Sequence, residues 1–136
     1  MATKINLSDN AKTFISTKID DMFHVCDDIY GAVISSVDGH LVMDIVKREL
    51  PSKKISAMTS SLMALGETVS KESGQGICEY VNVENNDGRV IVLRVGEALT
   101  LTTLSSKNSN LGMVLSASTI AANAIRDAIN NALQQK

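Results

Sequence analysis

The sequence predicts an α+β sandwich in which helices cover a five-stranded antiparallel sheet, in the order α-β-β-α-β-β-β-α. Segments with apolar residues at helical spacing alternate with short segments of strand-like pattern. The turn sequences at Asp38-Gly39 and at residues 85–88 each stand between two such strands and indicate hairpins. The chain has 136 residues, of which 44% are hydrophobic and 21% are charged. This size and composition are typical of one globular domain, which we expect to span residues 1–136.

The first helix and the first hairpin are predicted from patterns near the N-terminus. Ser8 or Asp9 can cap a helix over about residues 9–28. Its buried stripe is expected to consist of Ala11, Ile15, Ile19, Met22 and Cys26. A strand over residues 32–37 then leads through the Asp-Gly turn into a return strand over residues 41–45.

The second helix is expected to begin at residues 50–52 and to end at Gly74 and Gly76. Large residues at helical spacing form its apolar stripe: Ile55, Met58, Leu62, Leu65 and Val69. A second stripe holds only small residues: Ala57, Ser61, Ala64 and Thr68, with Ser60 beside them. Small side chains allow another helix to approach closely, so we predict a helix–helix contact along this stripe. The alternative is that the small residues form an ordinary solvated face.

Three strands and a last helix complete the pattern. The strands are expected over residues 77–84, 89–95 and 98–106, and the helix over residues 109–133. The run 90–93 is apolar on both faces, which indicates an interior strand. The strand over residues 77–84 contains only Glu79 to repel a neighbouring strand, so it is a candidate edge strand.

The edge strand and the stripe of small residues together predict a homodimer. An unprotected edge invites pairing with a second chain, and a two-fold, self-complementary dimer is the simplest assembly that uses both features. The residues predicted to form its interface are Ala57, Ser60, Ser61, Ala64, Thr68, Ile77, Glu79, Val81 and Val83.

Composition and charge argue against several classes of function. The net charge is −2 and aromatic residues make up 3% of the chain, so we expect no nucleic-acid partner. No apolar run is long enough for a signal peptide or a membrane span, so we expect a cytoplasmic protein with no membrane partner. Cys26 and Cys78 are then expected to be reduced thiols.

No group of residues in the sequence indicates catalysis. The chain has no P-loop, and Gly74-Gln75-Gly76 precedes a strand rather than a helix. His24 and His40 offer at most a partial metal set, and no serine lies in a nucleophile motif. Arg48 is the arginine best placed to meet a partner's phosphate, although all four arginines are expected to be solvated. We therefore expect a protein that is not an enzyme and that uses no metal and no cofactor.

Four short motifs stand in a characteristic order along the chain. They are the block 31–39 that ends in Asp38-Gly39, Leu65-Gly66-Glu67 in the second helix, the strands over residues 81–95, and a strand over residues 99–104 followed by Asn110-Leu111-Gly112. In this order and spacing they resemble the roadblock/LC7 family over about residues 8–129. The resemblance implies a profilin-like fold with one helix on one face of a five-stranded sheet and two on the other. It also implies dimers in which the second helices pack together and the third strands pair.

The resemblance further implies a regulatory or scaffolding role without a catalytic motif. Family members include dynein light chains and components of lysosomal signalling scaffolds, and many prokaryotic members act with Ras-like GTPases. We therefore expect a homodimer that binds a small Ras-like GTPase and modulates its GTP hydrolysis or nucleotide state. Arg48 and the outward side of the second helix are its candidate contacts. The alternatives are a scaffold or adaptor subunit of a motor or signalling complex, and a small-molecule sensor.

Overall fold

The structure follows the predicted order of helices and strands. The computed structural model describes the backbone of residues 7–134 and the side chains of residues 7–131. Its elements are α1 (Asp9–Val25), β1 (Ile29–Ser36), β2 (Leu41–Val46), α2 (Ser52–Glu72), β3 (Val81–Asn85), β4 (Gly88–Val95), β5 (Leu99–Ser106) and α3 (Leu111–Gln134).

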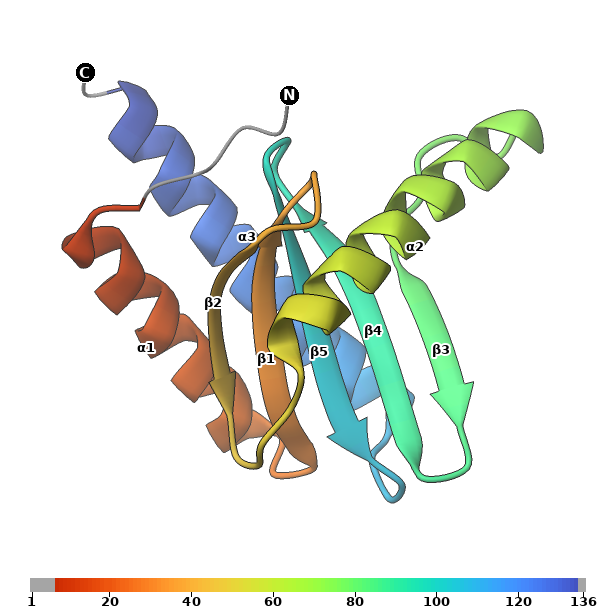
Figure 1. Ribbon diagram of the computed structural model, residues 1–136, viewed down its shortest axis with the longest axis horizontal. Helices are drawn as coiled ribbons and strands as arrows, with labels where there is room; N and C mark the ends of the chain where they lie inside the picture. The colour runs from red at the N-terminus through yellow and green to blue at the C-terminus, as the bar shows by residue number, and fades with distance from the viewer. Residues whose placement is uncertain (1–6, 135–136) are drawn as a thin grey trace.

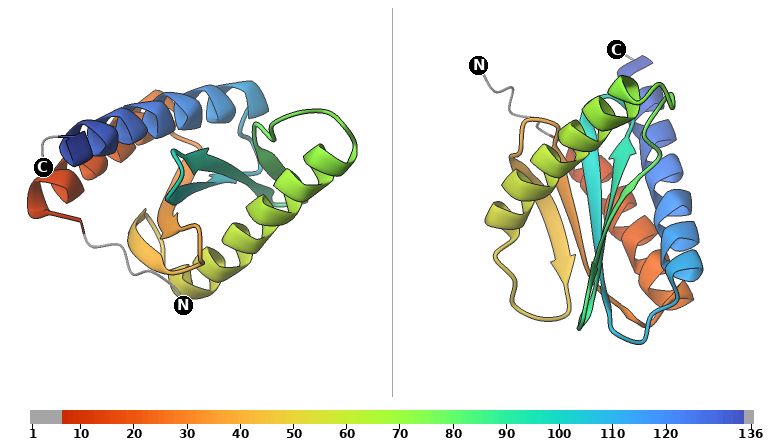
Figure 2. Two further views of the ribbon diagram at one scale, coloured as in Figure 1. Left: turned by 90° about the horizontal axis from the view of Figure 1, so that it is seen from above. Right: turned by 90° about the vertical axis from the view of Figure 1, so that its right-hand side faces the viewer.

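The strands form one antiparallel sheet of five, in the order β2-β1-β5-β4-β3. Helices α1 and α3 lie side by side on one face, and α2 crosses the other face alone (Figures 1 and 2). This is the division of helices that the resemblance implies. Strands β2 and β3 form the two edges of the sheet, so β3 is an edge strand as predicted.

The main core lies between the sheet and the pair of helices α1 and α3. Ser8 caps α1 by accepting a hydrogen bond from the backbone N of Ala11 at 3.1 Å, which confirms one of the two predicted caps. Fully buried side chains from both layers fill this core, among them Ile15, Ile19, Ile34, Ile91, Leu101, Val114 and Ile125. Burying one such side chain stabilises a fold by about 1.5–3 kcal/mol. No residue of α2 belongs to this cluster, so the face of the sheet that α2 covers is held in another way.

The β1–β2 hairpin turns at Asp38-Gly39, as predicted. Gly39 has a φ of +95°, and its N–H donates to the carbonyl O of Ser36 at 2.9 Å. A Cβ on Gly39 would lie only 3.3 Å from the Cα of Ala57, so the turn packs directly against α2. Glycine therefore serves both the left-handed backbone and the close approach.

Several element boundaries differ from the predicted ones, among them the end of α1, which lies at Val25 rather than near residue 28. Strand β1 begins at Ile29, three residues earlier than expected, and β3 begins at Val81, so Ile77 and Glu79 precede the strand. Helix α3 begins at Leu111 rather than at residue 109, because the Oδ1 of Asn110 accepts a hydrogen bond from the N of Met113 at 3.1 Å and so caps the helix. Strand β4 lies between β5 and β3, which confirms the interior strand.

Cys26 is buried and Cys78 is half-buried, and both are free. Within residues 7–134, no helix has the length and hydropathy that crossing a membrane requires.

Candidate functional site

Helix α2 has two faces of opposite character. Its buried residues are mostly small and polar: Ser52, Ser56, Thr59, Ser60 and Met63. Its outer face carries three large apolar side chains, Met58, Leu65 and Val69, which are 58%, 61% and 59% exposed. The predicted apolar stripe therefore does not face the core as a unit, because three of its five members lie on the surface of the single chain.

Hydrogen bonds between hydroxyl groups hold the inner face of α2 to the sheet. Ser60 Oγ donates to the carbonyl O of Ser36 at 3.0 Å and lies 3.2 Å from Ser35 Oγ. On β5, Thr102 Oγ1 donates to Thr59 Oγ1 at 2.8 Å. Because these side chains are short, the helix lies close to the sheet. A leucine or methionine at most of these positions would overpack the contact, which explains why the large residues face outward.

The second half of α2 approaches the edge strand β3. A Cβ on Gly66 would lie 2.7 Å from Cγ2 of Val81 and 3.4 Å from Sγ of Cys78. This close approach brings the second half of α2 beside β3, as the side view in Figure 2 shows. Leu65 and Val69, which are close to Gly66 along the helix, thus lie near the strand edge.

Most of the predicted interface residues are exposed or half-buried in the single chain, although Ala57 lies against the β1–β2 turn rather than beside β3. Those exposed on α2 are Ala57, Ser61, Ala64 and Thr68. Ile77 and Glu79 are exposed just before β3, and Val81 and Val83 are half-buried within it. Whether a second chain covers them stays a prediction.

Ser60 is a correction to the predicted interface. Its side chain is 3% exposed, and its hydroxyl bonds to β1 of its own chain. It lies beside the small stripe in sequence, but its side chain faces the sheet. The prediction missed Met58, Leu65 and Val69, because their spacing is also that of a core-facing stripe.

The predicted solvated role is wrong for two arginines on strand β4, because both form hydrogen bonds with groups of their own chain. The guanidinium of Arg89 donates to both carboxylate oxygens of Glu84, at 2.9 and 2.8 Å, and to the carbonyl O of Ser109 at 2.8 Å. Arg94 forms the same two-bond contact with Glu67 on α2. In each pair the hydrogen bond from the arginine is the main cause that lowers the pKa of the carboxyl group. Both arginines are therefore bound to groups of their own chain.

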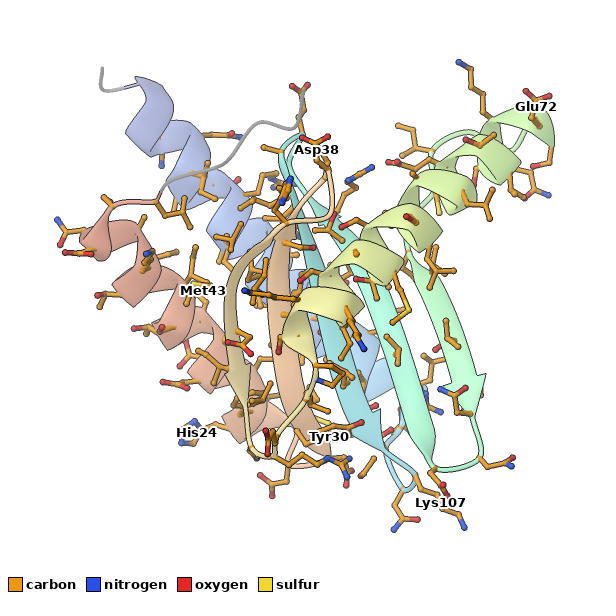
Figure 3. All side chains as sticks on the ribbon, viewed as in Figure 1. His24, Tyr30, Asp38, Met43, Glu72 and Lys107 are labelled. Atoms are coloured by element: carbon orange, nitrogen blue, oxygen red, sulfur yellow. The ribbon has the colours of Figure 1, made fainter. Side chains whose placement is uncertain are left out.

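Arg48 lies in the loop between β2 and α2. Its guanidinium stacks over the ring of Tyr30, 3.4 Å from the ring centroid, and the Nζ of Lys47 lies 5.1 Å from the centroid of Phe23. Figure 3 places Tyr30 at the end of the sheet opposite the hairpin tip at Asp38. Arg48 is exposed but held on an aromatic ring, so it is available to a partner in a defined position.

The histidines do not assemble a metal or catalytic site in the described part of the chain. His24 Nδ1 lies 2.7 Å from the carbonyl O of Asp20, and His40 is exposed. Residues 7–134 contain no cluster of three or more side chains that could ligate a metal ion.

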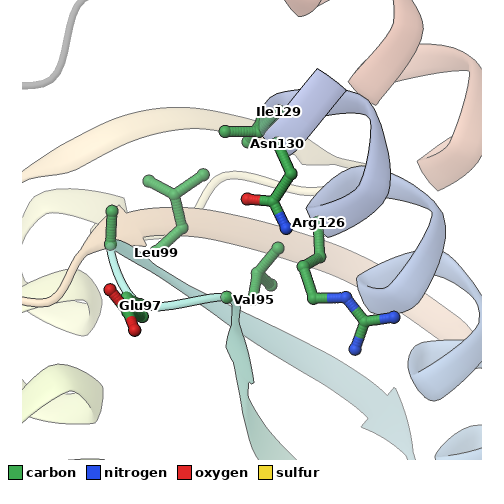
Figure 4. A pocket seen from close by; sticks show the side chains of 8 residues that line it. Val95, Glu97, Leu99, Arg126, Ile129 and Asn130 are labelled. Carbon is green, nitrogen blue, oxygen red and sulfur yellow. The ribbon is translucent and has the colours of Figure 1, made fainter. Parts of the chain in front are cut away.

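A cavity of about 490 Å³ opens between the β4–β5 turn and the last turns of α3 (Figure 4). Val95 and Leu99 form an apolar floor, and Arg126 and Glu97 stand at its rim. Arg126 already pairs with Asp127 at 3.1 Å, and Glu97 brings the opposite charge. The cavity therefore presents no concentrated charge that would anchor an ionic ligand.

Comparisons with known proteins agree with this architecture. A family model described as the Roadblock/LC7 domain matches residues 19–105. Two uncharacterized proteins of Methanocaldococcus jannaschii, MJ0310 and MJ1340, are each 24% identical to the chain over 86 residues, which are 63% of this chain and 75% of each relative.

Solved structures share the fold at low sequence identity. The gliding protein MglB from Thermus thermophilus superposes with a TM-score of 0.84 at 12% identity, covering 93% of this chain and 96% of MglB. A second MglB structure, described as having a tetrameric arrangement, gives 0.85 at 14% identity over the same shares. A Roadblock/LC7 domain from Streptomyces avermitilis gives 0.74 at 17% identity, covering 81% and 92%. The family model matches most of the chain, and the structure contains the predicted sheet and helices. The chain therefore belongs to the Roadblock/LC7 family.

Proposed function

We propose that the chain is a single-domain, homodimeric, non-catalytic regulator that binds a small Ras-like GTPase in the cytoplasm and modulates its GTP hydrolysis or nucleotide state. The observation that carries the proposal is the outer face of α2, where Met58, Leu65 and Val69 are each about 60% exposed beside the free edge of β3. An apolar helix face next to an unpaired strand edge is suited to covering by a second copy of the same surface.

The size of the exposed side chains supports a stable dimer. Complete burial of a Val, Leu or Met side chain is worth about 1.5–3 kcal/mol, so covering what remains exposed at positions 58, 65 and 69 adds about 1–2 kcal/mol each. A two-fold axis doubles this contribution, and it also joins two β3 edges through backbone hydrogen bonds. The sum is large enough to offset a substantial part of the entropy lost on association.

Family membership supports a GTPase as the partner, since many prokaryotic roadblock/LC7 proteins act with Ras-like GTPases. The arginine contacts favour a particular mode of action. Arg89 and Arg94 are held by carboxylates of their own chain, so they are poor candidates for an arginine finger. We therefore propose that the dimer acts by ordering the switch loops of the GTPase, with Arg48 as one contact.

The test is a pull-down with the purified chain, run once with GDP and once with a non-hydrolysable GTP analogue. Capture of a GTPase only in the GTP state supports the proposal and identifies the protein for single-turnover kinetics. If neither hydrolysis nor nucleotide exchange of that GTPase changes when the chain is added, the regulatory role is wrong.

A scaffold or adaptor subunit of a motor or signalling complex is the second candidate. Dimerisation favours it, because a two-fold dimer presents two copies of every surface and can bridge two partners. Capture of the same partners with GDP and with the GTP analogue would support this role over that of a GTPase regulator.

A further inference from the structure

The segment of residues 47–54, here called the basic segment, is the most strongly basic stretch of the described chain. It contains Lys47, Arg48, Lys53 and Lys54 and a single carboxylate, Glu49, so its net charge is +3. The whole chain carries −2, so the remaining residues together carry −5. A cationic segment on an otherwise acidic protein concentrates positive potential at one place on the surface.

Among the described residues, the charges of the basic segment have no carboxylate partner, although Lys47 and Arg48 lie over aromatic rings. All four cationic side chains are on exposed residues, and no carboxylate within the described residues forms an ion pair with any of them. The nearby carboxylates are otherwise engaged: Asp44 accepts a hydrogen bond from Ser52 Oγ, and Asp28 accepts one from Ser106. The strand arginines of this chain show the contrast, since both are bound by a carboxylate of their own chain.

The segment is nevertheless held in place. The N–H of Lys47 donates to the carbonyl O of Tyr30 at 2.8 Å, and Arg48 stacks on the ring of the same tyrosine. Leu50 packs against β1, where a Cβ on Gly31 would lie 3.2 Å from its Cδ1. A partner would therefore meet cations on an ordered backbone, which reduces the entropy that binding must offset.

Two of these lysines also stand where they weaken the helix. Lys53 and Lys54 lie in the first turn of α2, which contains no acidic residue and receives no side-chain cap. Positive charges at this end oppose the helix dipole. The chain follows the opposite rule at α1, where Ser8 caps the helix and Asp9 lies in its first turn. The Asp44 carboxylate, which accepts a hydrogen bond from Ser52 Oγ, offsets part of this cost, and a negatively charged partner would offset more.

We propose that the basic segment is a docking surface for an extended acidic segment of a partner protein. The Nζ of Lys47 lies over Phe23 of α1 and Arg48 lies over Tyr30, whereas Lys53 and Lys54 lie in the first turn of α2, so the cations are spread over the surface rather than gathered around one small anion. The surface lies at the N-terminal end of α2 and does not depend on the partner being a GTPase, so this inference goes beyond the proposed function.

The experiment measures the binding of a fluorescein-labelled peptide of ten glutamates to the full chain by fluorescence anisotropy. It is done at an ionic strength of about 0.01 M, where the screening length is about 30 Å, and at about 0.15 M. The test variant is Lys53→Glu/Lys54→Glu. The control is Lys12→Glu/Arg126→Glu, which changes the net charge equally at exposed positions on the other face of the sheet.

We expect the test variant to bind the peptide at least about tenfold more weakly than the unaltered chain and the control to change less than about twofold. The test variant should also melt a few degrees higher, because its new carboxylates favour the helix dipole. That opposite change in stability separates lost docking from damaged folding. An equal loss in both variants, or no binding by the unaltered chain at low salt, overturns the proposal. Binding to vesicles of phosphatidylcholine and phosphatidylserine without binding to the peptide overturns it in favour of a membrane surface.

Discussion

Arg94 on β4 and Glu67 on α2 are joined by two hydrogen bonds, from Nε to Oε2 at 3.0 Å and from Nη2 to Oε1 at 2.5 Å. Arg94 also donates to Thr100 Oγ1 on β5 at 3.1 Å. The contact therefore ties the second half of α2 to two strands of the sheet. Glu67 is next to Gly66, where α2 approaches β3. The ion pair therefore helps to fix the position of this part of the helix relative to β3.

Replacing Glu67 with Gln tests the contribution of this ion pair. The pKa of Glu67 is lowered mainly by its hydrogen bond to Arg94, so the folded state favours the charged form. The carboxyl group is 38% exposed, which limits the effect to about 0.5–1 kcal/mol at pH 7. A group with a lowered pKa contributes stability above its ordinary pKa, about 4.3 for Glu, and loses it as the pH falls through the folded value.

The measurement is urea denaturation of both proteins at pH 7 and at pH 3. Glu67→Gln should be less stable at pH 7, and the difference between the two proteins should shrink at pH 3. A difference in unfolding free energy that stays the same at both pH values would contradict this account of the pair.

The proposed dimer face is tested by placing a charge on it. Leu65→Glu, and equally Ala64→Glu, would bring like charges together across the two-fold axis, so we expect dissociation into single chains of 14.5 kDa. Ile120→Glu on α3 is the matched control, because Ile120 is as exposed as Leu65, at 68% against 61%. Light scattering gives the mass directly. The proposed face is wrong if the Leu65 variant keeps twice the single-chain mass, or if the control also dissociates.

A pair of neighbouring serines distinguishes the inner face of α2 from the outer one. Ser60→Ala removes the buried hydrogen bond to the carbonyl O of Ser36 and should lower the unfolding free energy by about 1 kcal/mol. Ser61 bonds only to the preceding turn of its own helix and is exposed, so Ser61→Ala should change stability by less than about 0.5 kcal/mol. The measurement is chemical denaturation of the two variants side by side. An equal loss of unfolding free energy in both variants would mean that the hydroxyl contact with β1 contributes nothing specific.

Gly88 at the start of β4 is predicted to tolerate no side chain. A Cβ there would lie 2.3 Å from the carbonyl O of Ser105, a backbone atom that cannot move without breaking the sheet. We expect Gly88→Ala to destabilise the chain by about 3 kcal/mol or more. Gly74→Ala is the comparison, because it meets no atom within 4 Å and carries only the strain of its φ of +70°, about 1 kcal/mol. Thermal melting of both variants checks this prediction: the melting temperature of Gly88→Ala should be well below that of Gly74→Ala.

Local patterns were sufficient to predict the order of elements and most of their boundaries. The turn at Asp38-Gly39 and the cap at Ser8 each depend on chemistry within four residues, which a sequence displays directly. The ion pair between Arg89 and Glu84 could also have been predicted from the sequence. The turn at residues 85–88 places these two residues opposite each other on β3 and β4, so their opposite charges were a readable signal.

The orientation of α2 could not be predicted in the same way. Periodicity shows which residues share a face of a helix, but not whether the core, solvent or another chain covers that face. The deciding partners, Ser35 and Thr102, lie 25 and 43 residues from the helix residues that they contact. The same holds for Glu67 and Arg94, which are 27 residues apart.

The hydroxyl contacts beneath α2 bear on how such a protein can diverge after gene duplication. The groups that attach the helix to its own sheet, such as Ser60 and Thr59, are different from the apolar groups that face outward, Met58, Leu65 and Val69. On the proposed dimer face, substitutions at the three outward positions would therefore alter which chains assemble while each copy still folds. A self-pairing ancestor can in this way give rise to two descendants that recognise only each other.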